Sequence, residues 1–251
     1  MLAELTRETW MSMLALEPEE VPRALLLRGT RNLRTYYEQY ARHLEKPREL
    51  RLPNGLLEDV CLGRLDGVPV AYASVYGAPM AAEVVHVAGV LGVPLVVHTG
   101  CYGALAGDIE IGDLLAVTDA GVGEGVSHYY HASARRFRAR MYGRDLQPMG
   151  GRLRFGPLFT TCALLAESRE QLTRWADEGY LGVDMETSAV FAVAEHFGMD
   201  RISLLYAADL PLRDHHLLLH KPEAEALRAQ GNRTMIELAL RIVRDYCVVR
   251  D

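Results

Sequence analysis

At residues 182–189 the chain reads GVDMETSA, where a short apolar strand turns at two acidic residues into an apolar helix. The helical pattern covers residues 185–197 and stops at Gly198, in the position where glycine commonly ends a helix. Residues 202–207 then form a second apolar strand. This strand–helix–strand succession is typical of an α/β layered fold, in which helices cover a sheet.

The same alternation extends over most of the chain, so we expect one α/β domain. Asp66-Gly67 predicts a two-residue hairpin between two of the strands. No linker rich in proline, glycine or serine divides residues 1–251, and residues 1–20 or so are expected to form an N-terminal helical extension. Strands are predicted at residues 24–27, 60–65, 68–75, 95–97, 113–119 and 202–207, and helices at residues 33–44, 80–91, 132–142, 171–178, 185–197 and 223–246.

The composition excludes several classes of protein. The 251 residues are 49% hydrophobic and 24% charged, which is ordinary for a globular protein and excludes a disordered chain. Because 33 Asp and Glu residues outnumber 27 Lys and Arg residues, the net charge of −6 does not favour nucleic-acid binding. No apolar run approaches the ~18 residues of a membrane span, and the acidic N-terminus does not resemble a signal peptide. Since the four cysteines form no CxxC pair, we expect free thiols in a cytoplasmic protein without a membrane partner.

Segments with polar or glycine residues follow three of the predicted strands, at residues 75–79, 98–103 and 207–211. In open α/β sheets, ligands bind where strands end. Gly77, Gly100 and Gly103 therefore either line a pocket or serve as tight turns, and their spacing alone favours turns. Neither GxGxxG nor GxxxxGKS/T occurs at these loops, so dinucleotide binding and nucleotide hydrolysis lack support.

Three acidic residues lie at the ends of predicted strands. Asp184 is expected to cap the helix that follows it, because the helix dipole favours a carboxylate at the N-terminus. Glu186 either has the same role or faces inward and accepts hydrogen bonds from a vicinal diol such as a ribose, and the periodicity favours neither. Asp209 is either a turn residue or, at the rim of a pocket, a general acid.

Two histidine-rich segments raise the question of a metal site. His216 and His220 lie four residues apart beside His215, but no HExxH motif accompanies them, and a solvated loop is the favoured interpretation. The same interpretation applies to His128 and His131. We therefore predict no metal site.

Taken in order, these segments resemble the nucleoside phosphorylase family, which includes bacterial purine nucleoside phosphorylase, uridine phosphorylase and the methylthioadenosine nucleosidases. Residues 182–189, with Asp209 after the next strand, are similar to the family's V-x-M-E-x-x-A helix and its downstream catalytic aspartate. The resemblance is collinear from about Leu25 to Val243. Supporting matches are GAP at 77–79, TGCYGAL at 99–105, IGDL at 111–114, EGVS at 124–127 and GPLFTT at 156–161.

The resemblance implies a single-domain, three-layer α/β/α sandwich with a central mixed sheet, and a pentosyltransferase activity. By this resemblance Met185 and Glu186 contact the ribose, and Asp209 hydrogen-bonds or protonates N7 of a departing purine. An acid at the base accelerates such a cleavage by typically ~10²–10⁴-fold, because negative charge develops there. Inorganic phosphate would be the co-substrate, with no other cofactor, and the products would be free base and ribose 1-phosphate.

The remaining site residues follow from the same resemblance. The phosphate or anion subsite corresponds to Gly29, Arg34, His98 and Cys101. The base pocket corresponds to Gly100, Tyr102, Gly103 and Leu164. Family members assemble as homo-oligomers built from dimers, commonly hexamers, in which a neighbouring subunit completes the site. Candidates for that borrowed cation are Arg48 and Arg51.

Departures from the family pattern leave three functions open. Arg34 lies one position later than the arginine of the family's phosphate-binding loop. His98 stands where the family has an arginine before the T/S-G-x-x-G loop, and a histidine is only partly charged near neutral pH. A purine nucleoside phosphorylase, with Arg31 as another candidate cation, is the first hypothesis. A nucleoside-binding protein that has lost turnover and an N-ribosyl hydrolase that uses water are the alternatives. Asp209 favours purine over pyrimidine nucleosides.

Overall fold

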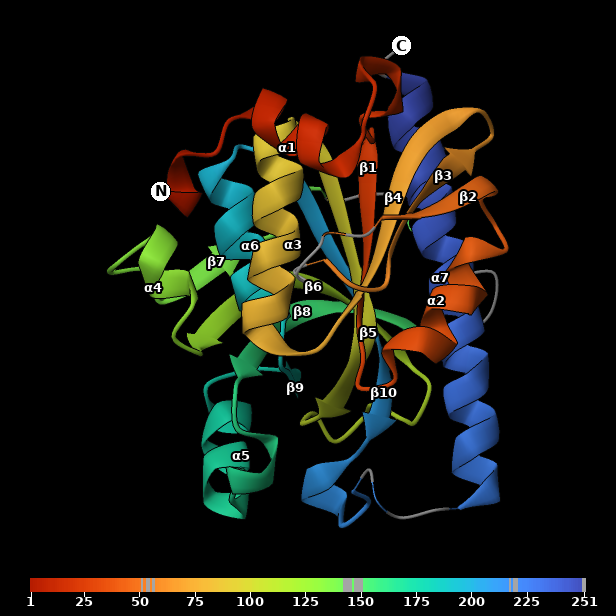
Figure 1. Ribbon diagram of the computed structural model, residues 1–251. Coiled ribbons are helices and arrows are strands. Elements are labelled where there is room, and N and C mark those ends of the chain that lie inside the picture. The colour runs from red at the N-terminus through yellow and green to blue at the C-terminus, as the bar shows by residue number, and fades with distance from the viewer. Residues whose placement is uncertain are drawn as a thin grey trace.

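The computed structural model describes residues 1–251 except residues 51, 53, 54, 56, 142–145, 147–150, 217, 219, 220, 250 and 251. Over this range a central mixed sheet carries helices on both faces, so the predicted three-layer α/β/α fold is confirmed (Figure 1). Among the described residues, no helix has both the length and the apolar character that a transmembrane span requires.

The sheet combines parallel crossover pairs with antiparallel hairpins. β1 lies parallel to both β4 and β5, and β3 and β2 continue the sheet beyond β4 as antiparallel strands. The strands are β1 (Ala24–Gly29), β2 (Glu45–Leu50), β3 (Val60–Leu65), β4 (Val68–Val75), β5 (Leu95–Ala104), β6 (Leu114–Gly123), β7 (Arg136–Arg138), β8 (Leu153–Thr161), β9 (Gly182–Asp184) and β10 (Asp200–Asp209).

Helices cover the two faces of this sheet unequally. α1, α3 and α6 lie on one face, and α2 and α7 lie on the other (Figure 1). The α-helices are α1 (Arg7–Leu14), α2 (Leu33–Ala41), α3 (Gly77–Leu91), α4 (Ser127–Tyr130), α5 (Arg169–Asp177), α6 (Thr187–His196) and α7 (Pro222–Val249). Short 3-10 helices are η1 (Leu2–Glu4), η2 (Pro18–Glu20), η3 (Leu164–Ala166) and η4 (Pro211–Arg213).

The apolar sequence of β1 follows from its position between the two helical layers. Leu25 and Leu27 face the core formed with α3 and α6, whereas Ala24 and Leu26 face the core formed with α2 and α7. A central parallel strand is buried on both faces, so it reads as a continuous apolar run.

β5 is the strand on which the site depends. It pairs with β1 on one side and β10 on the other, and its last residues pair with β9. β9, β8, β6 and β10 then pair in succession, so these strands return to β5. The carboxyl ends of β1, β5 and β10 therefore point the same way and meet near β9. In Figure 1 they lie at the lower end of the sheet.

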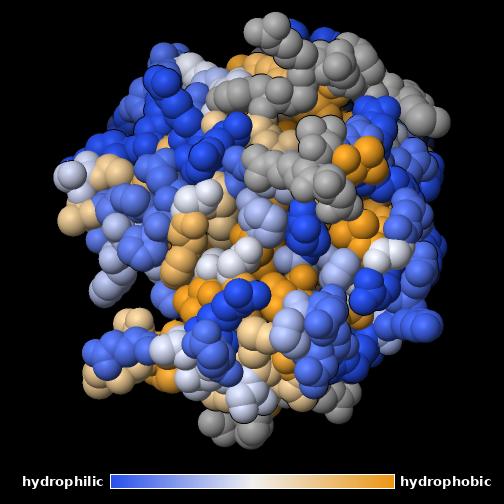
Figure 2. Space-filling view, turned by 90° about the horizontal axis from the view of Figure 1, so that it is seen from above, coloured by the Kyte–Doolittle hydropathy of each residue, from blue (hydrophilic) through white to orange (hydrophobic). Residues whose placement is uncertain are grey.

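The opposite end of the sheet is visible from above in Figure 2. Hydrophilic side chains cover much of that face, and hydrophobic ones gather near its middle (Figure 2). The N-terminal helix α1 is anchored near this end, since its Trp10 and Leu14 are buried in the same core as α3.

Most predicted elements are confirmed, and the hairpin of β3 and β4 has the predicted bounds at Asp66-Gly67. The predicted helix at residues 132–142 is wrong: its described part contains β7, which pairs with β6, and Tyr142 lies outside the described residues. Phe137 is buried between two exposed arginines, an alternation typical of a strand that outweighs the helical propensity of alanine and arginine. β8 was not predicted, because Gly156-Pro157 interrupts its apolar pattern.

α7 is held against the sheet by a contact between two glycines. A Cβ built on Gly231 would lie 2.5 Å from the carbonyl oxygen of Gly112, and Gly112 itself has φ +86°. The Gly112 N–H in turn donates to the carbonyl of Ala207, next to the end of β10. This contact sets the height of α7 and hence of Arg228, which lines the cavity described below.

We predict that Gly231→Ala destabilises the protein by about 1–3 kcal/mol, because the added methyl group must displace backbone. In an unobstructed helix the same change would stabilise by up to about 1 kcal/mol. Urea unfolding of the variant, beside the exposed Gln230→Ala as a control, measures the difference. A Gly231→Ala variant as stable as the wild type would contradict the close contact.

Candidate active site

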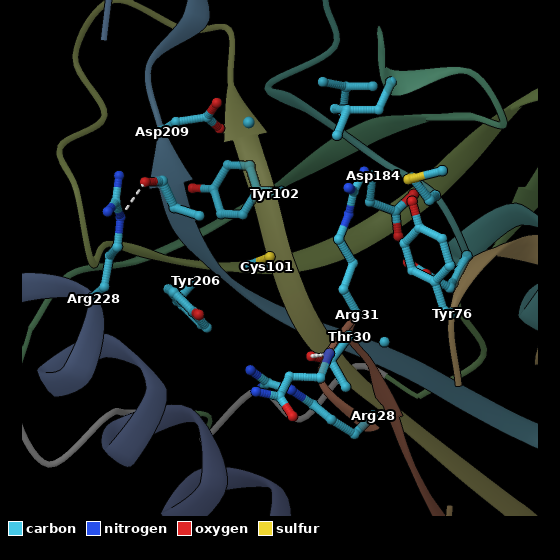
Figure 3. Close-up of a pocket in the computed structure, with 18 of the residues that line it drawn as sticks. Arg28, Thr30, Arg31, Tyr76, Cys101, Tyr102, Asp184, Tyr206, Asp209 and Arg228 are labelled. Atoms are coloured by element: carbon cyan, nitrogen blue, oxygen red, sulfur yellow. Dashed lines mark hydrogen bonds between the residues drawn. The ribbon is translucent and has the colours of Figure 1, made fainter. Parts of the chain in front are cut away.

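A cavity of about 280 Å³ lies at the carboxyl ends of β1, β5, β9 and β10, the position where α/β sheets bind ligands. In Figure 3, Asp209 and Arg228 lie on one side of the cavity and Asp184 and Tyr76 on the other, with Cys101 between them. Of the residues predicted for the site, the lining contains Gly29, Cys101, Tyr102, Gly103, Leu164, Met185, Glu186 and Asp209.

Glu186 is a buried carboxylate with a fixed position. It is 6% exposed, and its Oε1 accepts a hydrogen bond of 2.7 Å from the N–H of Gly77. Gly29 leaves the space for it, since a Cβ there would lie 2.9 Å from Glu186 Oε2. Burial and the neighbouring Asp184 carboxylate raise the pKa of Glu186 to about 8. The inward-facing alternative for Glu186 therefore agrees with the structure, and its side chain makes no capping hydrogen bond.

Asp184 caps α6, as predicted. Its Oδ2 accepts from the N–H of Thr187 at 2.9 Å, and its Oδ1 accepts from Thr160 Oγ1 at 2.7 Å. Thr187 Oγ1 also donates to Asp184. Burial raises the pKa of Asp184 to about 6, although these hydrogen bonds oppose that rise. The cap fixes the start of the helix directly beside Glu186.

His98 is not the cation that the phosphate subsite was predicted to contain. It is fully buried, outside the cavity lining, with Nδ1 2.9 Å from Ser203 Oγ and 3.2 Å from Thr187 Oγ1. Burial, aided by the charge of Arg28, lowers the pKa of His98 to about 3, so the imidazole is neutral at physiological pH. Gly100 likewise lies outside the lining, where a Cβ would meet Leu205 at 3.1 Å.

His98, Asp184 and Glu186 offer ligand atoms within 4.8 Å of one another, a grouping that the sequence analysis did not consider. Both oxygens of Asp184 already accept hydrogen bonds from Thr160 and Thr187. The Asp184 carboxylate is therefore already satisfied by donors of the protein, whereas Nε2 of His98 is buried without a hydrogen-bond partner among the described residues.

Arg28 is a cavity residue that the sequence analysis did not single out. It is 1% exposed, and its guanidinium forms no ion pair with a described carboxylate. Its Nη1 lies 3.7 Å from the sulfur of Met235, and its Nε has no hydrogen-bond partner. The rings of Tyr36 and Tyr206 lie 4.2 Å and 5.6 Å from its Cζ. Such a charge is costly to bury without an anion.

Of the other predicted cations, Arg31 lines the cavity, whereas Arg34 and Arg48 do not. Arg34 is exposed and pairs with Glu49 at 2.9 Å and Asp59 at 3.4 Å, so the structure does not place it in the cavity. Arg48 pairs with Glu20 at 3.1 Å, also away from the cavity. Arg51 and His220 lie outside the described residues. The arginines that do line the cavity are Arg28, Arg31 and Arg228.

The other side of the cavity carries two carboxylates. Asp209 ends β10, and Gly103 gives it room, since a Cβ there would lie 3.1 Å from Asp209 Oδ1. Glu167, which sequence reasoning missed, also lines the cavity, and its buried Oε1 has no hydrogen-bond partner. Burial and the charge of Asp209 raise the pKa of Glu167 to about 7. Leu164 lies on the same wall.

Residues 32–244 match the Phosphorylase superfamily, which covers most of the chain. The chain therefore belongs to this superfamily, and the predicted family is confirmed.

Curated relatives include a guanosine phosphorylase from Halorubrum lacusprofundi, 30% identical over 53% of this chain and 58% of its own length. A DeoD-type purine nucleoside phosphorylase from Myxococcus xanthus is 30% identical over 59% of this chain and 62% of its own length. The chain thus spans less than two thirds of these relatives.

Solved structures agree on the fold. A uridine phosphorylase from Vibrio fischeri ES114 superimposes with a TM-score of 0.75 at 21% identity, over 92% of this chain and 96% of that one. A complex of uridine phosphorylase from Vibrio fischeri ES114 with 6-hydroxy-1-naphthoic acid gives a TM-score of 0.74 at 21% identity, over 90% and 93% of the two chains.

The raised pKa of Glu186 predicts how stability depends on pH. Because the folded protein holds this proton more tightly than the unfolded chain, Glu186 makes the free energy of unfolding fall as the pH rises from about 4.5 to about 8. Glu186→Gln keeps an acceptor for the Gly77 N–H without the charge. We expect it to be more stable than the wild type at pH 8 and less sensitive to pH.

Thermal unfolding at pH 5, 6, 7 and 8 tests this expectation, with the exposed Glu83→Gln on α3 as the matched control. Parallel pH profiles for wild type and Glu186→Gln would show that Glu186 ionises as an ordinary surface carboxylate.

Proposed function

We propose that this chain is a nucleoside phosphorylase that converts a purine nucleoside and inorganic phosphate into free base and ribose 1-phosphate, with no further cofactor. The observation that carries the proposal is a single cavity that presents Glu186, Asp209 and the buried guanidinium of Arg28. These groups provide a hydrogen-bond acceptor for sugar hydroxyls, an acid for the base and a permanent cation for phosphate.

The ribose is assigned to the Glu186 end of the cavity. Met185 and Glu186 line it together, and the acceptor position of Glu186 is fixed by Gly77. The pKa of about 8 makes the ionised form of Glu186 the minor one at pH 7, and in that form it also favours the positive charge that develops on the ring as the glycosidic bond breaks. Fixing the sugar orients its anomeric carbon for attack.

The base is assigned to the Asp209 end. As the bond to the sugar lengthens, the electron pair moves onto the base, and Asp209 stabilises it by donating a proton or hydrogen bond to N7 of a purine. Asp209 lies in the cavity lining at the end of β10, where Gly103 leaves space for its carboxylate. This arrangement supports a purine, since a pyrimidine has no N7.

Phosphate is assigned to Arg28 in place of the predicted Arg34 and His98. A guanidinium stays charged at any physiological pH and binds phosphate through paired N–H donors. Arg28 lies close enough to Glu186 and Cys101 for its charge to lower the pKa of both groups against the effect of burial. The Cys101 thiol nevertheless stays neutral, because burial raises its pKa to about 11. Cys101 therefore adds no negative charge that would repel an anion bound at Arg28.

Incubation with a panel of nucleosides, with and without phosphate, tests the proposal. We expect purine base and ribose 1-phosphate only when phosphate is present, with Asp209→Asn slower by roughly 10²–10⁴-fold. Free ribose without phosphate would identify a hydrolase. A nucleoside that raises the melting temperature while no product forms would identify a binding protein.

Arg28→Met tests the phosphate assignment. Loss of charge-assisted hydrogen bonds is expected to raise KM for phosphate about 10- to 100-fold, with KM for the nucleoside little changed. Because methionine removes an unpaired buried charge, the variant should unfold at the same or a higher temperature than the wild type. Arg34→Met is the contrasting variant. An effect on phosphate KM from Arg34→Met but not from Arg28→Met would restore the assignment made from the resemblance.

Homo-oligomeric assembly from dimers, possibly to a hexamer, and a cytoplasmic location stay predictions of the sequence. Arg48 is the described candidate for a residue that completes a neighbour's site, and its pairing with Glu20 would have to be exchanged for that role. Light scattering of the purified protein distinguishes an oligomer from a monomer.

A further inference from the structure

We propose that His98, Asp184 and Glu186 form a binding site for a divalent transition-metal ion of the zinc class, and that a bound ion excludes the nucleoside from the cavity. The site itself follows from the geometry of the described residues. Its effect on the nucleoside rests on the proposed function, in which Glu186 holds the sugar. The ion is therefore an inhibitor of the proposed reaction and takes no part in it as a cofactor.

Three metal-binding side chains from separate parts of the chain converge at this point. His98 lies in β5, Asp184 ends β9, and Glu186 is the N-cap of α6. All three are buried, and their ligand atoms lie within 4.8 Å of one another. Bonds from zinc to imidazole and carboxylate are about 2.0–2.2 Å long, so two ligands of one ion lie up to about 4.3 Å apart. Small side-chain rotations therefore complete the site.

The hydrogen bonds of His98 leave a lone pair for a metal. Thr187 Oγ1 donates to Asp184, so it can only accept from His98 Nδ1, which lies 3.2 Å away. Nδ1 therefore carries the proton, and Ser203 Oγ, at 2.9 Å, is a second acceptor for it. Metal-binding histidines almost always donate from their other ring nitrogen in this way, which fixes the tautomer and the ring orientation.

Nε2 of His98 is the atom that points to a ligand. It is fully buried and has no hydrogen-bond partner among the described residues. A buried acceptor without a donor is costly, so a group that binds its lone pair would complete this part of the interior. A metal ion does so, and the neutral imidazole is the commonest metal ligand in proteins.

Gly29 leaves the space between His98 and Glu186 open. A Cβ at residue 29 would lie 3.1 Å from His98 Nε2 and 2.9 Å from Glu186 Oε2, so both atoms border the same space. The other oxygen of Glu186, Oε1, accepts from the N–H of Gly77 at 2.7 Å. This bond orients the carboxylate and leaves Oε2 for an ion that also binds Nε2.

Asp184 completes the set of ligands and balances the charge. Thr160 and the N–H of Thr187 hold its carboxylate, as outer-shell donors usually hold a ligating carboxylate. Two carboxylates neutralise a divalent ion, so a bound ion adds no net charge to a cavity whose lining contains Arg28. The imidazole favours zinc-class ions over Mg²⁺, which prefers oxygen ligands and keeps its waters.

Equilibrium dialysis of the metal-free protein against Zn²⁺, without substrates, tests the site. We expect one ion per chain, retained in an excess of Mg²⁺. His98→Asn keeps an amide near the position of Nδ1 but removes Nε2, and it should weaken Zn²⁺ binding by roughly 100-fold or more, since loss of an outer-shell partner alone costs roughly 10- to 100-fold. His216→Asn, in an exposed segment, is the matched control and should leave binding unchanged.

Ser203→Ala tests the site without removing a ligand. Because Ser203 only holds the imidazole ring, its loss should weaken Zn²⁺ binding by roughly 10-fold. Co²⁺ gives visible absorption bands that shift when an imidazole joins its ligands. Wild type and Ser203→Ala should show the shifted bands, and His98→Asn should not.

Absence of bound zinc, binding that His98→Asn leaves unchanged, or binding that His216→Asn abolishes would overturn the site. Phosphorolysis is measured separately with a chelator present. If a nucleoside is cleaved while no zinc binds, this inference fails and the proposed function stands. If zinc binds as expected and no nucleoside is cleaved, the metal site stands and the proposed function fails.

Kinetics with the nucleoside that is cleaved tests the exclusion. The ion occupies the Glu186 oxygen that the sugar hydroxyls need, so Zn²⁺ at its Kd should raise KM for the nucleoside about twofold with kcat unchanged. An unchanged KM would show that ion and sugar bind together, which overturns the exclusion.

Discussion

The site depends on a buried positive charge that the described protein does not neutralise. Taking a guanidinium out of water costs several kcal/mol unless an anion and hydrogen bonds replace its hydration. β1 places Arg28 among a sulfur and two tyrosine rings, which compensate that cost only in part. An anionic ligand would supply both the opposite charge and the hydrogen-bond acceptors that Arg28 lacks. Binding of such a ligand therefore adds to stability, and the protein keeps part of its interior unsatisfied for that purpose.

The same cavity contains a buried acidic group, Glu186, that is hydrogen-bonded to Gly77 instead of pairing with that cation. If Glu186 and Arg28 bonded directly, each would satisfy the other and neither would face a ligand. Instead the Gly77 N–H holds Glu186, and Gly29 lets it approach His98 closely. The neutral state of His98 belongs to this arrangement, since a third charge would pair with Glu186 and withdraw it from the cavity. The structure thus keeps Glu186 apart from Arg28, and burial of Glu186 beside Asp184 raises its pKa to about 8.

Sequence patterns predicted the layers of the fold and the residues at strand ends, because burial and turns leave local signals. The strand–helix junction at Asp184 and Glu186, and Asp209 at the end of β10, were found in this way. Of the arginines in the cavity lining, only Arg31 was among the predicted cations, because a sequence comparison transfers positions but not charge states. His98 stands where the resemblance places an arginine, and it is neutral. Arg28 was overlooked, although a single charged residue within the apolar strand β1 was a signal that could have pointed to it. Glu167 left none, because only the tertiary structure shows that its oxygen is buried.

The distribution of charge across the cavity agrees with the direction in which charge moves during phosphorolysis. Negative charge leaves with the base and arrives with phosphate, so the base end and the phosphate end of the cavity need different protein groups. A permanent guanidinium suits phosphate, which is anionic before and after the reaction. The base becomes anionic only as the bond breaks, and a guanidinium there could stabilise that charge but could not release a proton to the base. In the proposed reaction Asp209 supplies that proton or hydrogen bond, and burial beside Asp209 raises the pKa of Glu167 to about 7. A cavity with guanidinium at one end and carboxyl groups at the other is therefore suited to separating a sugar from its base.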